Sequence, residues 1–206
     1  LIRILTTLLS KEDYGYYQTT LSTFGLIRVF SMMWLSNSVV RLFGGYQKDR
    51  QQHVFYSTLF YGALLSSIVV GSIAFGINFF IFQSKIGSEL FHLVNLAIIA
   101  SLFNTVFESF VLVFRAGLEP KKYSIYWIFF AVGKPLIGVF LIYFFNFQAD
   151  GIFIGFIIVP LILDVFLLYQ LDRFSSFRFS FFSKKLVKTF LNYGVPISFS
   201  FLAFWV

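Results

Sequence analysis

The sequence predicts an all-α polytopic membrane protein, and its composition and one long apolar run are the reasons. Of its 206 residues, 58% are hydrophobic and only 12% are charged, whereas soluble domains carry about 25% charged residues. Residues 54–84 contain no charged side chain, a run longer than the roughly 20 residues that a membrane-spanning helix needs. The apolar runs are too long for the short alternating strands of a barrel. We therefore predict helices and exclude a soluble fold.

The apolar stretches predict the helices in order. They are a partial first helix over 1–10, helices over 14–43, 53–82, 90–115, 123–146 and 151–170, and the start of a seventh near residue 188. Residues 1–185 are expected to form one transmembrane lobe with its connector, and residues 186–206 to begin a second lobe. Both ends of the chain lie within apolar stretches, so we interpret it as a fragment truncated at both ends.

Aromatic residues at the predicted membrane surface support the second, fifth and sixth helices. Such amphipathic rings prefer the level of the lipid headgroups. They are Tyr14, Tyr16 and Tyr17, then Tyr123, Tyr126 and Trp127, and finally Tyr169. Residues 171–189 form the longest connection, where phenylalanines alternate with arginines and lysines. This composition suits an amphipathic stretch lying on the inner leaflet, although a simple cationic connector explains it equally well.

The loop charges predict the orientation of the helices. Loops after the second, fourth and sixth helices hold eleven basic residues: Arg41, Lys48, Arg50, Arg115, Lys121, Lys122, Arg173, Arg178, Lys184, Lys185 and Lys188. The other loops hold only Lys11 and Lys85. The positive-inside rule places the first set in the cytoplasm. The net charge of +7 therefore reflects membrane topology, and no nucleic-acid partner is expected.

Four charged residues stand out because they lie well inside the predicted spans, where each costs about 2.5–3.5 kcal/mol on insertion scales. Counting along the helices places Arg28 and Lys134 near the middle of the membrane. The same count places Glu108 and Asp164 nearer the cytoplasm. The functional interpretation is a polar substrate path whose two central cations attract an anionic group. The alternative is that the two acids simply pair with Arg28, Lys134 or a loop cation.

Two prolines lie beside these charges. A proline inside a helix leaves the carbonyl four residues earlier without its hydrogen-bond donor, so Pro135 frees Ala131 and Pro160 frees Phe156. Free carbonyls can line a cavity, although ordinary kinks are an equally good explanation. Small residues four positions apart favour close helix packing: Ser67/Gly71, Ser72/Gly76 and Gly151/Gly155.

The sequence offers little for cofactor or enzyme chemistry. It has no cysteine, and His53 and His92 form no metal-binding motif. Nucleotide-binding glycine motifs are missing as well, so we expect no cofactor and no metal. A membrane glycosyl- or phosphotransferase would need clustered acids or histidines, and only Glu12 and Asp13 are adjacent. We therefore predict a transporter rather than an enzyme.

Three short motifs carry a resemblance to a known family. Residues 8–17 read LLSKEDYGYY and resemble the LLSxEDYGxY turn of polysaccharide flippases, members of the multidrug/oligosaccharidyl-lipid/polysaccharide exporter superfamily. Residues 34–43, WLSNSVVRLF, resemble the end of their second helix. Residues 191–196, LNYGVP, resemble the start of their seventh helix.

The resemblance implies a MATE-like transporter with two lobes, of which this chain supplies the N-terminal six-helix lobe. It implies export of undecaprenyl-diphosphate-linked oligosaccharide for O-antigen or capsule synthesis across the bacterial inner membrane, by alternating access. Arg28 and Lys134, with Arg3 as a third candidate, would contact the diphosphate. The expected partners are the lipid-linked oligosaccharide, the bilayer, a coupling ion (H⁺ or Na⁺) and polysaccharide polymerase or assembly proteins. A multidrug antiporter for organic cations, from the same superfamily, is the alternative.

Overall fold

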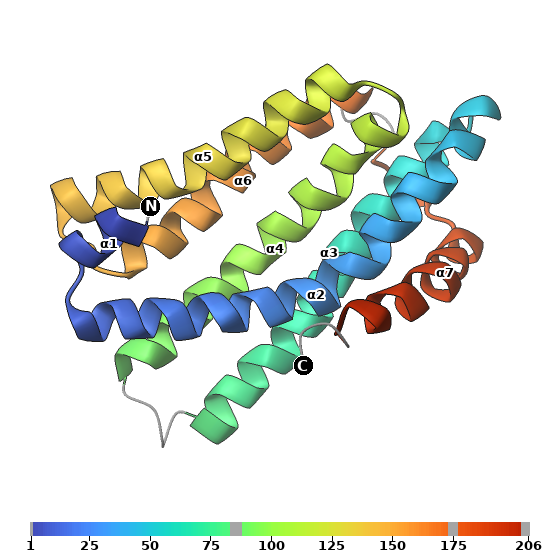
Figure 1. Cartoon of the computed structure of the whole chain (residues 1–206). Coiled ribbons are helices and arrows are strands. Elements are labelled where there is room, and N and C mark those ends of the chain that lie inside the picture. The colour runs from blue at the N-terminus through green and yellow to red at the C-terminus, as the bar shows by residue number, and fades with distance from the viewer. Residues whose placement is uncertain (1, 83–87, 173–176, 203–206) are drawn as a thin grey trace.

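The structure is a computed structural model that describes residues 2–82, 88–172 and 177–202, and it confirms the all-α prediction (Figure 1). The long helices are α2 (Lys11–Lys48), α3 (Gln52–Ile77), α4 (Ser88–Ala116), α5 (Pro120–Phe145) and α6 (Asp150–Asp172). The shorter elements are α1 (Ile2–Leu8), the π-helix η1 (Asn78–Phe82), the 3₁₀-helix η2 (Phe179–Phe181) and α7 (Lys184–Leu202). Five helices are long and apolar enough to cross a membrane, and the chain is a multi-pass membrane protein.

Helix α2 has 38 residues, about 57 Å at 1.5 Å per residue, which is longer than a hydrocarbon core of about 30 Å. Its start is fixed by Ser10, whose Oγ accepts a hydrogen bond from the backbone N–H of Asp13 at 3.1 Å. Glu12 and Asp13 occupy the first turn, where carboxylates interact favourably with the helix dipole. The polar turn in the LLSKEDYGYY motif is therefore a helix cap.

Helix α3 ends earlier than predicted. Its α-helical part stops at Ile77, and the π-helix η1 follows where the sequence predicted a continuous helix to residue 82. Asn78, only 3% exposed, lies at this change and donates to the backbone oxygen of Phe91 and to Oδ1 of Asn95 on α4. A buried amide needs such partners. The two hydrogen bonds from Asn78 to α4 occur at the position where α3 changes to a π-helix.

The connector after α6 is shorter than predicted, because α6 continues to Asp172 and α7 begins at Lys184. Its described part packs on α3. The hydroxyls of Ser57 and Tyr61 donate to the carbonyls of Arg178 and Phe177, and Thr58 Oγ1 accepts from the backbone N–H of Ser183. The backbone of this segment, for which an amphipathic stretch on the inner leaflet was predicted, is therefore hydrogen-bonded to side chains of α3. Lys85, Arg173 and Phe174 lie outside the described residues.

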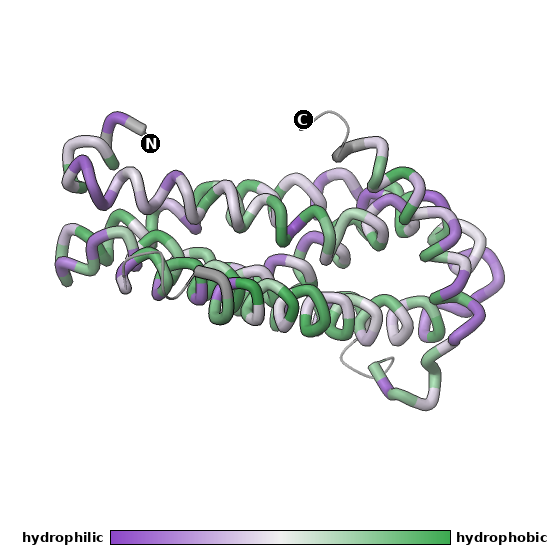
Figure 2. The backbone as a smooth tube through the Cα atoms, turned by 90° about the horizontal axis from the view of Figure 1, so that it is seen from below, coloured by the Kyte–Doolittle hydropathy of each residue, from purple (hydrophilic) through white to green (hydrophobic). Residues whose placement is uncertain are grey.

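Helix α4 lies at the centre of the bundle and packs against α2, α3 and α6, while α5 and α6 form an antiparallel pair above it in Figure 1. Helix α5 turns a strongly apolar face outward, with Ile128, Phe129 and Leu136 more than 60% exposed. Hydrophilic stretches gather toward the two ends of the bundle in Figure 2. This distribution is what a bilayer around the helices requires.

Helix α7 packs along α2, and its predicted role as the start of a second lobe stays a prediction. Phe190 accepts a hydrogen bond from Ser38 Oγ through its carbonyl at 3.0 Å. A Cβ atom at Gly194 would overlap the backbone of Trp34. The close approach of these two helices therefore requires glycine at this position.

Candidate functional site

A cavity of about 230 Å³ lies between α2, α4, α5 and α6. Three of the four predicted site residues line it. The lining residues are Arg28, Glu108, Trp127, Phe130, Ala131, Lys134, Pro135 and Phe156. The lining therefore combines three charged side chains with the aromatic rings of Trp127, Phe130 and Phe156.

Arg28 and Glu108 form an ion pair in this cavity. Glu108 Oε2 accepts hydrogen bonds from Arg28 Nη2 at 2.7 Å and from Nε at 3.0 Å. The Glu108 side chain is 3% exposed, whereas that of Arg28 is 43% exposed. The sequence placed Glu108 nearer the cytoplasm than Arg28, yet the two side chains meet, so the simpler alternative of charge pairing holds for this pair.

Helix packing explains how the two residues meet. The hydroxyls of Ser31 and Thr105 contact each other at 3.0 Å, which sets the register of α2 against α4. With that register, Glu108 lies about 9 Å further along than Arg28 at 1.5 Å per residue. Two long side chains extended toward each other span such an offset. Counting residues along each helix separately therefore did not predict that the two side chains meet.

Lys134 is a half-buried cation in the same cavity. Its Nζ donates to Asn104 Oδ1 at 3.5 Å. It also lies 3.5 Å from the ring centroid of Phe130 and 4.8 Å from that of Phe156, so the aromatic faces stabilise its charge. Within the described residues, no carboxylate forms an ion pair with Lys134. Because the charges of Arg28 and Glu108 cancel, the positive charge of Lys134 gives the cavity a net positive charge.

Asn104 is a residue of this site that sequence reasoning missed. It is 1% exposed, and its Nδ2 donates to the carbonyl of Phe156 at 2.8 Å and to that of Ala100 at 2.7 Å. The Phe156 carbonyl is the one that Pro160 leaves without a backbone donor. The Asn104 side chain supplies a donor in its place, beside the cavity. An asparagine in the middle of an apolar span was the signal that could have identified it.

Close packing of α5 and α6 sets the position of Lys134. A Cβ atom at Gly155 would lie 2.6 Å from the Lys134 carbonyl oxygen, and one at Gly138 would lie 2.9 Å from the Cα of Ile152. The predicted packing role of Gly151 and Gly155 is thus explained, since both glycines face α5.

We expect Gly155→Ala to lower the free energy of unfolding by about 1–3 kcal/mol, because the added methyl group meets backbone rather than a movable side chain. Gly76→Ala is the matched control, since a Cβ atom there has nothing within 4 Å. That control is expected to be neutral or stabilising by about 0.5–1 kcal/mol. Denaturant unfolding followed by tryptophan fluorescence measures both. Equal stability of the two variants would contradict the packing argument.

Asp164 does not line this cavity. It is 6% exposed, and its Oδ1 has no hydrogen-bond partner in the described part of the chain. It follows Phe156 on α6 by eight residues, about 12 Å along the axis. Asp164 therefore lies about two turns of helix beyond Phe156, and its place on the predicted substrate path stays a prediction.

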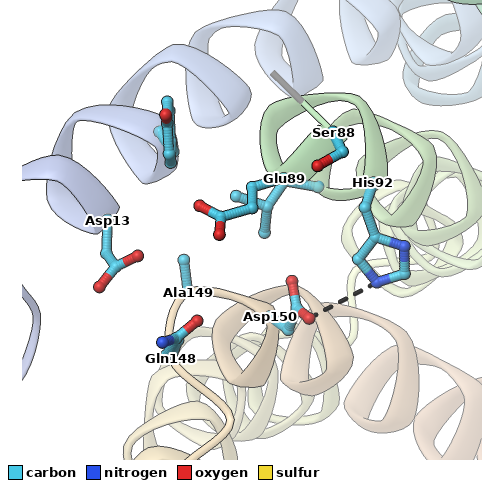
Figure 3. Close-up of a pocket in the computed structure, with 9 residues that line it drawn as sticks. Asp13, Ser88, Glu89, His92, Gln148, Ala149 and Asp150 are labelled. Carbon is cyan, nitrogen blue, oxygen red and sulfur yellow. Dashed lines mark ion pairs between the residues drawn. The ribbon is translucent and has the colours of Figure 1, made fainter.

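A second pocket, of about 210 Å³, lies at the end of the bundle away from the basic loops. Asp13, Glu89 and Asp150 stand in the first turns of α2, α4 and α6, and their carboxylates face a shared space in Figure 3. Asp150 Oδ2 lies 3.5 Å from His92 Nε2. The described residues contain no group of three or more acids, histidines or cysteines arranged to hold a metal ion. Helix dipoles account for the carboxylates.

Comparison with known proteins identifies the fold. No family model matches the sequence, and no curated protein matches it either. Two solved structures are similar, each with a TM-score of 0.69 and 15% identity over 97% of this chain. One is a MOP superfamily transporter from Pyrococcus furiosus, described as having a binding pocket of reverse polarity that suggests a different function. The other is a multidrug resistance MATE family transporter in an outward-facing conformation.

This chain spans about half the length of those two, 47% of each. The similarity confirms the predicted MATE-like fold. The polysaccharide flippase, a narrower prediction, stays a prediction.

Proposed function

We propose that this chain is part of a membrane transporter that moves a lipid-linked oligosaccharide, carried on undecaprenyl diphosphate, across the bacterial cytoplasmic membrane. The observation that carries the proposal is Lys134, a half-buried cation of this cavity that forms no ion pair with a carboxylate in the described part of the chain. A diphosphate supplies the acceptor oxygens that such a cation lacks, and charge-assisted bonds of this kind are strong. Both structural neighbours are transporters, which supports transport rather than enzyme activity.

The other charged residues of the cavity have distinct roles in this proposal. Arg28 remains 43% exposed while it is paired, so it presents a second cationic surface to the anion. Glu108 holds Arg28 in place. Asp164 lies beyond the cavity and is left as a candidate for binding a coupling ion, H⁺ or Na⁺.

Export of organic cations is the second candidate. It is favoured by the acidic pocket of Asp13, Glu89 and Asp150 and by the multidrug transporter among the neighbours. That pocket lies at an end of the bundle, however, whereas the central cavity carries the excess positive charge. Pocket polarity is the feature that suggested a different function for the Pyrococcus furiosus transporter, and here it favours an anionic substrate.

We expect Lys134→Ala to reduce transport about tenfold or more, because a hydrogen bond to a charged group contributes about 1.5–3 kcal/mol. Cells depleted of the full-length protein and complemented with each variant provide the assay. The leaflet that holds the lipid-linked oligosaccharide is determined with an impermeant glycan-modifying reagent. Wild type should restore exposure on the outer leaflet, and Lys134→Ala should not.

Lys121→Ala is the matched control, because Lys121 is an exposed lysine at the start of the same helix. It should restore transport as wild type does. A normal distribution of the oligosaccharide in depleted cells would refute the flippase proposal. Resistance to organic cations conferred by the full-length protein would then favour the second candidate.

A further inference from the structure

A third pocket, of about 310 Å³, lies where α7 meets α2 and α4, at the end of the bundle that carries the basic loops. Its lining contains two arginines and no acidic residue. The residues are Asn37, Val40, Arg41, Arg115, Tyr193 and Ile197. This pocket is separate from the central cavity, because Arg41 follows Arg28 by 13 residues, about 20 Å along α2.

The two arginines of this pocket come from different helices and have no acidic partner. In the described residues, neither Arg41 nor Arg115 forms an ion pair. The Cζ atom of Arg41 lies 4.3 Å from the ring centroid of Tyr193, and this cation–π contact orients the guanidinium group. Arg115 stands in the last turn of α4. Two positive charges therefore line one pocket without any negative charge beside them.

Asn37 supplies an independent observation. Its Nδ2 is buried and has no hydrogen-bond partner among the described residues. A buried amide donor left unpaired costs free energy, and almost all such groups in proteins have an acceptor. Because Asn37 is one of the lining residues, a rotation of its side chain toward a ligand with acceptor oxygens in this pocket would remove that cost.

We propose that Arg41, Arg115 and Asn37 bind a phosphate-type oxyanion at this junction of α2, α4 and α7. A guanidinium group matches phosphate geometry with two parallel hydrogen bonds, and the amide of Asn37 adds a neutral donor. A phosphate of this kind belongs either to an anionic phospholipid headgroup or to a diphosphate that arrives from solution or on a lipid. The proposal does not depend on the function assigned to the central cavity.

The test uses the purified full-length protein in nanodiscs of phosphatidylcholine, with sodium pyrophosphate as the probe and the unfolding temperature as the signal. All proteins carry Lys134→Gln, so that this cation of the central cavity does not contribute to the response. We expect pyrophosphate to raise the unfolding temperature at concentrations where sodium chloride of equal ionic strength does not. Arg41→Gln with Arg115→Gln should raise the half-saturating concentration about tenfold or more.

Two further variants make the result specific. Lys48→Gln removes a positive charge from the last turn of α2 and should respond to pyrophosphate as the parent does. Asn37→Leu should weaken the response without lowering the unfolding temperature in the absence of pyrophosphate, since it removes the unpaired donor. If the double glutamine variant does not fold, Arg41→Lys with Arg115→Lys keeps the charges but removes the forked geometry, and it should still bind more weakly than the parent.

Nanodiscs containing phosphatidylglycerol distinguish the two sources of phosphate. If this lipid raises the unfolding temperature of the parent and removes its response to pyrophosphate, the ligand is a lipid headgroup. If the response to pyrophosphate is unchanged, the ligand is a diphosphate. Equal responses in the arginine variants and Lys48→Gln, or no response in the parent, would overturn the proposal. Because Lys134 is substituted throughout, neither result bears on the central cavity.

Discussion

Replacing Arg28 with leucine is expected to lower the free energy of unfolding by about 3 kcal/mol. Glu108 is 2% exposed, and Arg28 supplies both of the hydrogen bonds that its Oε2 accepts from α2. Without the arginine, a carboxylate remains buried beside Lys134 and the aromatic rings with no direct donor from α2. Tryptophan fluorescence during denaturant unfolding in detergent micelles measures this loss.

Glu108→Leu alone is expected to cost less than Arg28→Leu, since the 43% exposed Arg28 side chain already reaches open space. Arg28→Leu combined with Glu108→Leu should recover most of the stability, because a pair of apolar residues often replaces a buried ion pair without loss. A double variant as unstable as Arg28→Leu would contradict this account. Transport is expected to stay impaired in the double variant, which separates the role of the arginine in folding from its role at the anion.

Replacing Asn104 is expected to cause the second large loss of stability, because its side chain makes several hydrogen bonds beside the cavity. Asn104→Leu should cost about 2 kcal/mol, because it leaves the Phe156 carbonyl without a donor and removes the acceptor of Lys134. Pro160→Ala restores a backbone N–H that can donate to the same carbonyl. The cost of Asn104→Leu should therefore fall by about 1 kcal/mol in the Pro160→Ala background. Unfolding free energies of the four proteins in this cycle measure the coupling.

Pro135→Ala provides the control for that cycle. This proline also interrupts a span, but it frees the carbonyl of Ala131 on α5, whereas the Nδ2 of Asn104 donates to the carbonyls of Ala100 and Phe156. Asn104→Leu should thus cost the same with proline or alanine at position 135. Equal coupling to both prolines would show that the effect reflects general helix flexibility and not the carbonyl of Phe156.

The positions of the long helices were largely readable from the sequence. Each predicted span overlaps an observed helix, because the length of an apolar run is a local property that the thickness of a bilayer selects. The differences lie at the ends. Ser10 and Asp13 start α2 through a side-chain cap, and α3 changes to a π-helix at Asn78. These details depend on single hydrogen bonds that hydropathy does not record.

The pairing of charges was not readable in the same way. Glu108 and Asp164 were assigned similar depths on their own helices, yet only Glu108 meets Arg28. Distance along one helix says nothing about which face carries a side chain toward its neighbours, nor about the register between helices. That register is set by contacts such as Ser31 with Thr105, which join residues far apart in the chain.

Composition and the lengths of apolar runs were enough to establish a helical membrane protein and its principal spans, since both follow from the transfer of local segments into lipid. The tertiary structure alone decided that Glu108 pairs with Arg28, that Lys134 forms no ion pair among the described residues, and that Asn104 contacts both Lys134 and the Phe156 carbonyl. Those outcomes depend on the packing of α2, α4, α5 and α6 around one cavity, and such packing is a property of helices in contact rather than of any segment alone.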